Sequence, residues 1–263
     1  MVDQKALLDD LKRQAREVES DLAAQVKALP EVKDRLEDEY KRASKINRTA
    51  ATWNSWLDER ITQAAAAWVL GTVFVRFAED NRLIPEPYLT APDIEHRDLA
   101  EARYGAYVET DDDPTYRGWL ERAFADLGSG HVGGLLFHPD HNPLFQIPIS
   151  HDGARALVEF WRERDAEGVL VHDFTDPLNE DGTEGWDTRF LGDLYQDLSE
   201  NARKTYALLQ TPEFVEEFIL DRTMDPAVRE FGYQDLKMID PTCGSGHFVL
   251  GAFRRLVRLW AEG

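Results

Sequence analysis

The sequence has a single cysteine, Cys243, among its 263 residues. One thiol cannot form a disulfide within the chain, so the fold must be stable without such cross-links, as is usual in a reducing compartment. The N-terminal stretch MVDQKALLDDLKRQ is charged from residue 3 onward and lacks the apolar centre of a signal peptide. We therefore expect a cytoplasmic protein.

Basic residues are fewer than acidic ones. The chain has 30 lysines and arginines against 50 aspartates and glutamates, a formal net charge of −20. Residues 1–50 contain eleven of each kind, so the whole deficit lies in residues 51–263, with 19 basic and 39 acidic residues. Nucleic-acid affinity depends largely on cations that displace counterions from phosphates. The isolated chain should therefore bind duplex DNA poorly unless its arginines gather on one face.

No apolar run is long enough to cross a bilayer. The longest extends nearly unbroken from Ala64 to Val75, and Arg76 follows it directly. This pattern predicts a buried central helix that ends before Pro85, and no membrane partner. With 43% apolar residues, the chain can form one large or two ordinary domains.

Apolar periodicity predicts a mainly α fold. The first stripe, at spacings of three and four, consists of Leu8, Leu11, Ala15, Val18, Leu22 and Val26. We divide the chain into an amphipathic helical hairpin over residues 1–50, a helical domain with loops over residues 51–205, and a third segment over residues 206–263. The hairpin packs on its own domain in the interpretation we favour, and forms a docking arm for a partner in the alternative. Residues 86–118 are rich in Asp, Pro and Gly and predict a loop.

Histidines in the middle of the chain raise the question of a metal site. His131, His138 and His141 lie within eleven residues, with Asp140 between the last two, so ligand groups are present in principle. Prolines flank the second pair, and no further ligand cluster with zinc-like spacing occurs in the sequence. We predict an ordinary polar loop and no metal.

One stretch suggests chemistry: MIDPTCGSGHFVLGAF, residues 238–253. The preceding LKMID has the composition of a short buried strand, and Gly244 and Gly246 permit backbone conformations and close ligand approach that a Cβ would block. A helix predicted from His247 directs its free amides toward this loop. Such a strand-loop-helix turn is typical of nucleotide-like ligands.

Spacing separates the possible ligands of this turn. A dinucleotide fingerprint requires a third glycine where Val249 stands, and a phosphate-binding P-loop requires lysine after Gly251, which alanine follows instead. Asp240 suits the cationic end of a zwitterion, and the helix amides suit its carboxylate. S-adenosylmethionine carries both groups. A glycine-rich turn without a ligand is the alternative.

A helix start precedes this loop in the chain. Thr211 can cap open amides, Pro212 is preorganised for a first helical position, and Glu213 favours the positive helix end. Taken alone, TPEF predicts only the beginning of a helix.

Two motifs together resemble a known family. DPTCGSGHF is similar to the cofactor motif of DNA methyltransferases that modify the exocyclic amine of adenine, and TPEFVEEF, about thirty residues upstream, resembles the motif that precedes it in those enzymes. The stretch from Trp186 to Phe253, and less specifically residues 64–84, resembles the PglX methyltransferases of BREX and phage-growth-limitation defence systems. The resemblance implies a helical N-terminal region followed by the first strand-loop-helix of a Rossmann-like S-adenosylmethionine-dependent methyltransferase domain.

The resemblance also implies cofactor contacts. Thr211 and Pro212 would border the methionine end of S-adenosylmethionine, and Asp240 would meet its amino group. The loop that would wrap the cofactor consists of Pro241, Thr242, Cys243, Gly244, Ser245 and Gly246. Cys243 is then a small residue of the loop and not a nucleophile, because methyl transfer to an amine needs none.

The family's target-base motif is missing. Such enzymes hold a flipped-out adenine with an Asn/Asp-Pro-Pro-aromatic tetrapeptide, and none occurs here. The nearest sequence is Asn142-Pro143-Leu144-Phe145, which precedes the cofactor loop and has leucine where the second proline belongs. We therefore interpret the chain as the N-terminal portion of a larger adenine methyltransferase, inactive alone and without a catalytic residue of its own.

Two alternatives stay open at this stage. The chain could be a non-enzymatic acidic helical module that docks other defence proteins, or a complete small methyltransferase that uses Asn142. In the favoured interpretation, the full-length protein acts on double-stranded DNA, with other BREX proteins as further partners.

Overall fold

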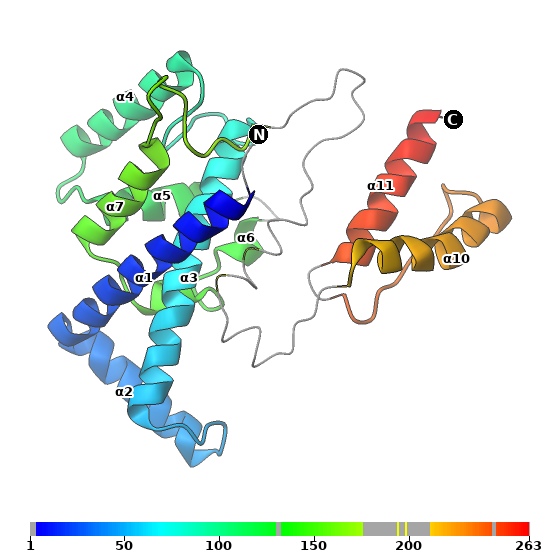
Figure 1. The fold of residues 1–263 in the computed structure, drawn as a ribbon. Coiled ribbons are helices and arrows are strands. Elements are labelled where there is room, and N and C mark those ends of the chain that lie inside the picture. The colour runs from blue at the N-terminus through cyan, green and yellow to red at the C-terminus, as the bar shows by residue number, and fades with distance from the viewer. Residues whose placement is uncertain are drawn as a thin grey trace.

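The computed structural model describes residues 4–129, 133–175, 194, 198, 211–243 and 246–262. The helices within them are α1 (Gln4–Ala28), α2 (Pro30–Lys45), α3 (Trp53–Asp80), α4 (Ile94–Thr110), α5 (Tyr116–Gly128), α6 (Gly133–Leu136), a 3₁₀ turn η1 (Pro143–Gln146), α7 (His151–Arg162), α10 (Glu213–Phe231) and α11 (His247–Glu262). No strand forms in the described residues, where a single antiparallel bridge joins Arg164 to Leu170. The predicted mainly α fold is confirmed (Figure 1).

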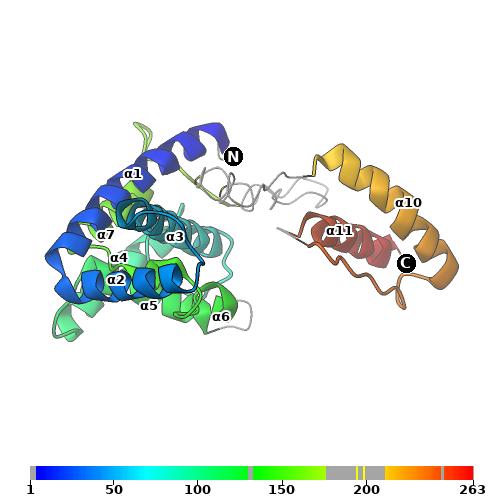
Figure 2. The ribbon, with the colours of Figure 1, turned by 90° about the horizontal axis from the view of Figure 1, so that it is seen from below.

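Helix α1 lies along α3 and also contacts α2 and α7 (Figures 1 and 2). Its buried stripe is Leu7, Leu11, Ala15, Val18, Leu22 and Val26. The stripe therefore begins at Leu7 and not at Leu8, because a spacing of four on either side of Leu11 keeps side chains on one face of a helix. These residues share one hydrophobic core with α3, α5 and α7. The hairpin packs on the rest of the helical region, as the favoured interpretation predicts.

Helix α3 is the centre of this core. Its 28 residues include the predicted apolar run and are long and apolar enough to cross a membrane, but 72% of the most apolar window is buried by the rest of the fold. Trp68 Nε1 donates to the Ile147 carbonyl at 3.1 Å, and Thr72 Oγ1 accepts from Trp161 Nε1 at 2.8 Å. The surrounding fold thus covers the apolar surface of α3, and the buried indole N–H groups of Trp68 and Trp161 both have acceptors.

The end of α3 carries a buried ionic cluster. The Arg76 guanidinium contacts the carboxylates of Glu79 at 2.7 Å and Asp80 at 2.5 Å, and all three side chains are fully buried. Glu79 also accepts from the amides of Tyr88 and Leu89, and Asp80 from the amide of Phe174. The cluster therefore fixes two distant loops against the end of α3.

The expectation of a loop over residues 86–118 was wrong, because α4 lies within it. This helix buries only Ala100 and Tyr107, so its sequence lacks a clear apolar stripe. Asp93 caps its first turn by accepting from the His96 amide at 2.9 Å, and Tyr104 stacks on Tyr116 with ring centroids 4.8 Å apart. A cap and tertiary aromatic contacts stabilise a helix that periodicity does not reveal.

Helices α10 and α11 form a pair with a small core of their own. Leu220 and Met224 of α10 pack against Ala252 of α11, with partly buried side chains around them. The structure does not show the strand predicted over residues 236–240, which lie in an extended segment without a ladder partner among the described residues. A strand requires a neighbour to satisfy its backbone groups.

Candidate functional site

The loop before α11 has a defined local geometry. Asp240 Oδ1 accepts from the amide of Thr242 at 3.0 Å, which forms an Asx turn directly after the extended segment. The Gly246 amide donates to the Cys243 carbonyl at 2.7 Å. Gly246 has φ +85°, in the left-handed region that favours glycine. This conformation, and not crowding, requires glycine there, because the nearest atom to an added Cβ would be Cys243 Sγ at 3.9 Å.

Helix α11 begins at the end of this loop. The Leu250 amide donates to the Gly246 carbonyl at 2.8 Å and closes the first turn. The positive end of the helix therefore faces the loop, where it favours an anionic group. Gly244 and Ser245, two of the predicted cofactor residues, lie outside the described residues. The rest of the loop is accessible to solvent, since Pro241, Thr242 and Cys243 are exposed.

The second predicted segment lies at the start of α10. The helix begins at Glu213, and Pro212 occupies the N-cap position with no side-chain cap. The prediction that Thr211 caps this helix and that Pro212 takes its first position was therefore wrong. In Figures 1 and 2 the N-terminal ends of α10 and α11 lie next to each other. The fold of the pair therefore brings the TPEF segment and the glycine-rich loop to the same end.

Close packing holds the two helices in this arrangement. A Cβ at Gly251 of α11 would lie 2.0 Å from Glu216 Oε1 and 3.0 Å from Leu220 Cδ1 of α10, so only glycine permits this approach. Glu216 is fully buried at the contact. Arg255 of α11 contacts three carboxylates spaced one turn apart on α10, those of Glu217, Asp221 and Asp225.

Sequence reasoning missed this arginine clamp. The available signal was the row of α10 carboxylates at positions 217, 221 and 225, which places three acids on one helical face. A row of acidic side chains usually faces solvent. Arg255, which pairs with this row, lies thirty residues or more further along the chain. The role of Arg255 follows only from the packing of α11.

The helix pair exposes a large amount of apolar surface. On α11 the exposed side chains Val249, Phe253, Val257 and Trp260 follow one another at helical spacing, and Trp260 is 74% exposed. Ile239, in the extended segment before the loop, is 85% exposed. On α10, Phe214 and Phe218 are exposed as well. Exposed apolar patches of this kind mark surfaces that contact another part of a protein or a partner.

The alternative site around Asn142 has a structural role. Its Oδ1 accepts from the Leu144 amide at 3.0 Å and its Nδ2 donates to the Leu136 carbonyl at 2.8 Å, so both ends of the amide cap η1 and its preceding turn. The rings of His138 and His141 stack with centroids 4.8 Å apart. Among the described residues, no group of three metal-ligating side chains forms.

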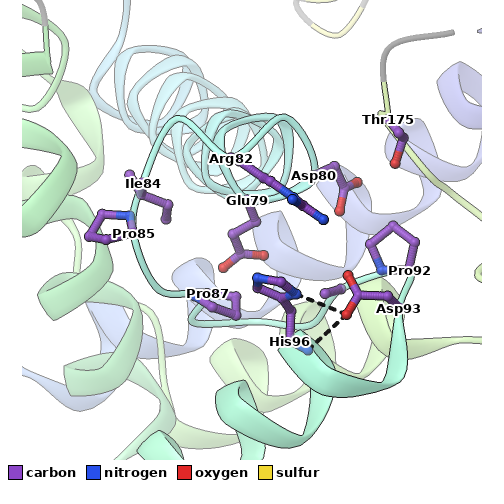
Figure 3. A pocket seen from close by; sticks show the side chains of 11 residues that line it. Glu79, Asp80, Arg82, Ile84, Pro85, Pro87, Pro92, Asp93, His96 and Thr175 are labelled. Carbon is purple, nitrogen blue, oxygen red and sulfur yellow. Dashed lines mark hydrogen bonds and ion pairs between the residues drawn. The ribbon is translucent and has the colours of Figure 1, made fainter. Parts of the chain in front are cut away.

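A cavity of about 350 Å³ lies beside the end of α3 (Figure 3). Glu79 and Asp80 line it together with Arg82, Asp93 and His96, and Asp93 Oδ1 lies 2.8 Å from His96 Nδ1. The two buried carboxylates already bind Arg76 and backbone amides. The carboxylates that line the cavity are therefore already used within the ionic cluster. None of the predicted cofactor residues lines this cavity.

Comparison with known proteins agrees with the motifs. The chain is 79% identical, over 262 residues and its whole length, to the adenine-specific methyltransferase PglX of Streptomyces coelicolor. It spans only 22% of the length of that protein. No family model matches the chain, and no solved structure matches it. The predicted resemblance to PglX methyltransferases is thereby confirmed for the entire chain.

Proposed function

We propose that the chain is the N-terminal portion of an enzyme that transfers a methyl group from S-adenosylmethionine to the exocyclic amine of adenine in host DNA, within a cytoplasmic phage-defence system. The observation that carries this proposal is the 79% identity with PglX over the whole chain, a range that contains the loop from Asp240 to Gly246. The geometry of that loop is compatible with it. Double-stranded DNA and other BREX proteins are the proposed partners of the full-length protein.

The residues of the loop fit the methionine end of the cofactor. S-adenosylmethionine supplies an electrophilic methyl group next to a zwitterionic amino acid. The Asp240 carboxylate would bind the ammonium group, and the positive end of α11 would bind the carboxylate. Gly246 would let the backbone turn closely around the ligand because it adopts a positive φ.

Thr211 and Pro212 would border the same ligand. They lie at the N-terminal end of α10, and the Gly251 contact with Glu216 and the Arg255 clamp hold this helix against α11. Because both segments belong to one packed pair, the spacing between them is set by side-chain packing and not by the long connection. This packing supports the proposal that both motifs contact a single ligand.

The exposed apolar surface supports the rest of the proposal. In a Rossmann-like domain a helix such as α11 covers a sheet, and Phe253, Val257 and Trp260 have the spacing of such a buried face. The segment over residues 236–240 would then become a strand when neighbouring strands supply its partners. Without those strands and the target-base tetrapeptide, the 263-residue chain alone should not methylate DNA.

Methylation by the purified full-length protein is the test. With labelled S-adenosylmethionine and host DNA, we expect transfer to adenine by the wild type, no transfer by the 263-residue chain, and a loss of at least a hundredfold in Asp240→Ala. Asp235→Ala is the matched control, since Asp235 is exposed and precedes the loop by five residues. Equal activity of Asp240→Ala and the control would overturn the cofactor role.

A further inference from the structure

Residues 40–57 differ from the rest of this acidic chain. The stretch YKRASKINRTAATWNSWL contains four basic residues and no acidic one. It covers the end of α2, the connection to α3 and the first turn of α3, which we call the basic corner (residues 40–57). Its cationic residues are Lys41, Arg42, Lys45 and Arg48, and all four are exposed. The corner is therefore a positive surface on a molecule with a net charge of −20.

The backbone of the corner is held by a Schellman motif at the end of α2. The Arg48 amide donates to the Ala43 carbonyl at 2.9 Å and the Asn47 amide to the Ser44 carbonyl at 3.1 Å. Asn47 has φ +56°, the left-handed conformation that this motif requires. The backbone of Arg48 is thus fixed just beyond the helix end, three residues after Lys45.

Aromatic side chains pack together within the corner. Tyr40 lies 5.5 Å from Trp53 and 5.7 Å from Trp56, measured between ring centroids, and the two tryptophans stack. The Tyr40 hydroxyl donates to the Ala51 carbonyl at 3.0 Å. These contacts join the end of α2 to the start of α3, so the connection that carries Arg48 is anchored on both sides.

The charges of the corner are available to a partner. In the described part of the chain, neither Lys45 nor Arg48 has a side-chain ion pair or hydrogen bond. The carboxylates that precede the corner on α2 are engaged, Glu37 by Lys33 and Lys41 and Glu39 by Arg60. Lys41 is itself paired with Glu37 and Asp38. Among the described residues, an anionic partner would therefore meet Lys45 and Arg48 as cations that are not already neutralised.

We propose that the basic corner binds the phosphate backbone of duplex DNA in the full-length protein. Exposed cations such as Lys45 and Arg48 suit phosphate oxygens, and the eighteen residues of the corner add no carboxylate of their own that would repel them. Phosphate contacts carry no sequence information, so the corner adds affinity without selecting a site. This inference rests on the proposed function, because it takes DNA as the substrate.

The test uses the full-length protein and neutralises two charges. In Lys45→Gln/Arg48→Gln, we expect the affinity for a short random-sequence duplex to fall about tenfold or more at about 0.1 M salt, and the slope of log affinity against log salt to decrease by about 2. Arg16→Gln/Lys27→Gln removes the same charge from exposed positions on α1 and should change neither value. Thermal unfolding and S-adenosylmethionine affinity should match the wild type in both variants.

The outcomes separate this inference from the proposed function. A wild type that neither binds S-adenosylmethionine nor methylates DNA would refute the proposed function itself. An active wild type whose duplex affinity and salt slope are unchanged in the corner variant, or equally reduced in the α1 variant, would refute only the corner. Phosphatidylserine vesicles provide a second anionic probe. If the corner variant lost vesicle binding and kept DNA binding, the corner would contact lipid headgroups and our proposal would be wrong.

Discussion

The Arg76 guanidinium lies 2.5 Å from the Asp80 carboxylate, and both side chains are fully buried at the end of α3. Burial raises the pKa of Asp80 from 3.8 to about 7, although Arg76 acts in the opposite direction. The desolvation of the carboxylate thus outweighs the attraction of its partner. The folded chain holds a proton on Asp80 at pH values where the unfolded chain has released it.

Stability should therefore depend on pH through Asp80. Between about pH 4 and pH 7 the folded state binds more protons at this group, so its contribution to the free energy of unfolding decreases as pH rises, by at most about 1.4 kcal/mol per pH unit. Urea unfolding of the wild type and of Asp80→Asn across this range measures the difference. The expected result is a wild-type curve that declines relative to the variant; parallel curves would refute the assignment.

Arg82 should be replaceable by glycine with a gain in stability. It has φ +53° in the Schellman motif that ends α3, where the Leu83 amide donates to the Ala78 carbonyl at 2.8 Å. A residue with a Cβ is strained in this conformation, so Arg82→Gly should stabilise the chain by about 0.5–1 kcal/mol. Arg16→Gly, at an exposed position inside α1, should instead destabilise by about 1 kcal/mol. Thermal unfolding of both variants decides, and a destabilised Arg82→Gly would contradict the prediction.

Gly251→Ala should loosen the α10–α11 pair. The new methyl group would meet Glu216 and Leu220, and we expect a loss of about 1–3 kcal/mol. Gly105→Ala is the control, because nothing lies within 4 Å of an added Cβ there and alanine favours the helix. Hydrogen exchange of the α10 and α11 amides should increase in Gly251→Ala only. Unchanged exchange would show that the helices do not need this contact.

Gly246→Ala should weaken S-adenosylmethionine binding by the full-length protein at least tenfold, because alanine strains the loop at φ +85°. Gly232→Ala is matched in strain, with φ +75° and open space around it, but lies outside the loop and should bind normally.

The 263-residue chain should bind S-adenosylmethionine with a dissociation constant no tighter than ~0.1 mM, about −5.5 kcal/mol, since ribose and adenine contacts would be missing. Calorimetry tests both expectations. Low-micromolar binding by the chain would mean that its pocket is complete.

The 263-residue chain should not retain duplex DNA at ~0.15 M salt. Its acidic surface outweighs the four cations of the basic corner, and screening at this salt weakens the remaining attraction. Gel shift or anisotropy with a random duplex provides the measurement. Micromolar retention would show that the corner is sufficient without the rest of the protein.

The sequence by itself determined the features that depend on local pattern. The α1 stripe and the apolar run of α3 have helical periodicity, so their burial was predictable within one residue. The order and spacing of TPEF and DPTCGSGHF indicate an adenine methyltransferase, and the stretch from Trp186 to Phe253 around them indicates the resemblance to PglX. Each of these signals is contained in a short window of residues.

Only the tertiary structure decided the features that join distant residues. Helix α4 is stabilised by a cap and by aromatic contacts to α5, and the Arg255 clamp connects side chains thirty or more residues apart. The segment over residues 236–240 has strand-like composition, but a strand forms only when a neighbour completes its hydrogen bonds, and composition cannot supply that neighbour. Burial of Asp80 in the core likewise raises its pKa against the opposing effects of Arg76 and the Phe174 amide, so this shift follows from packing and not from sequence.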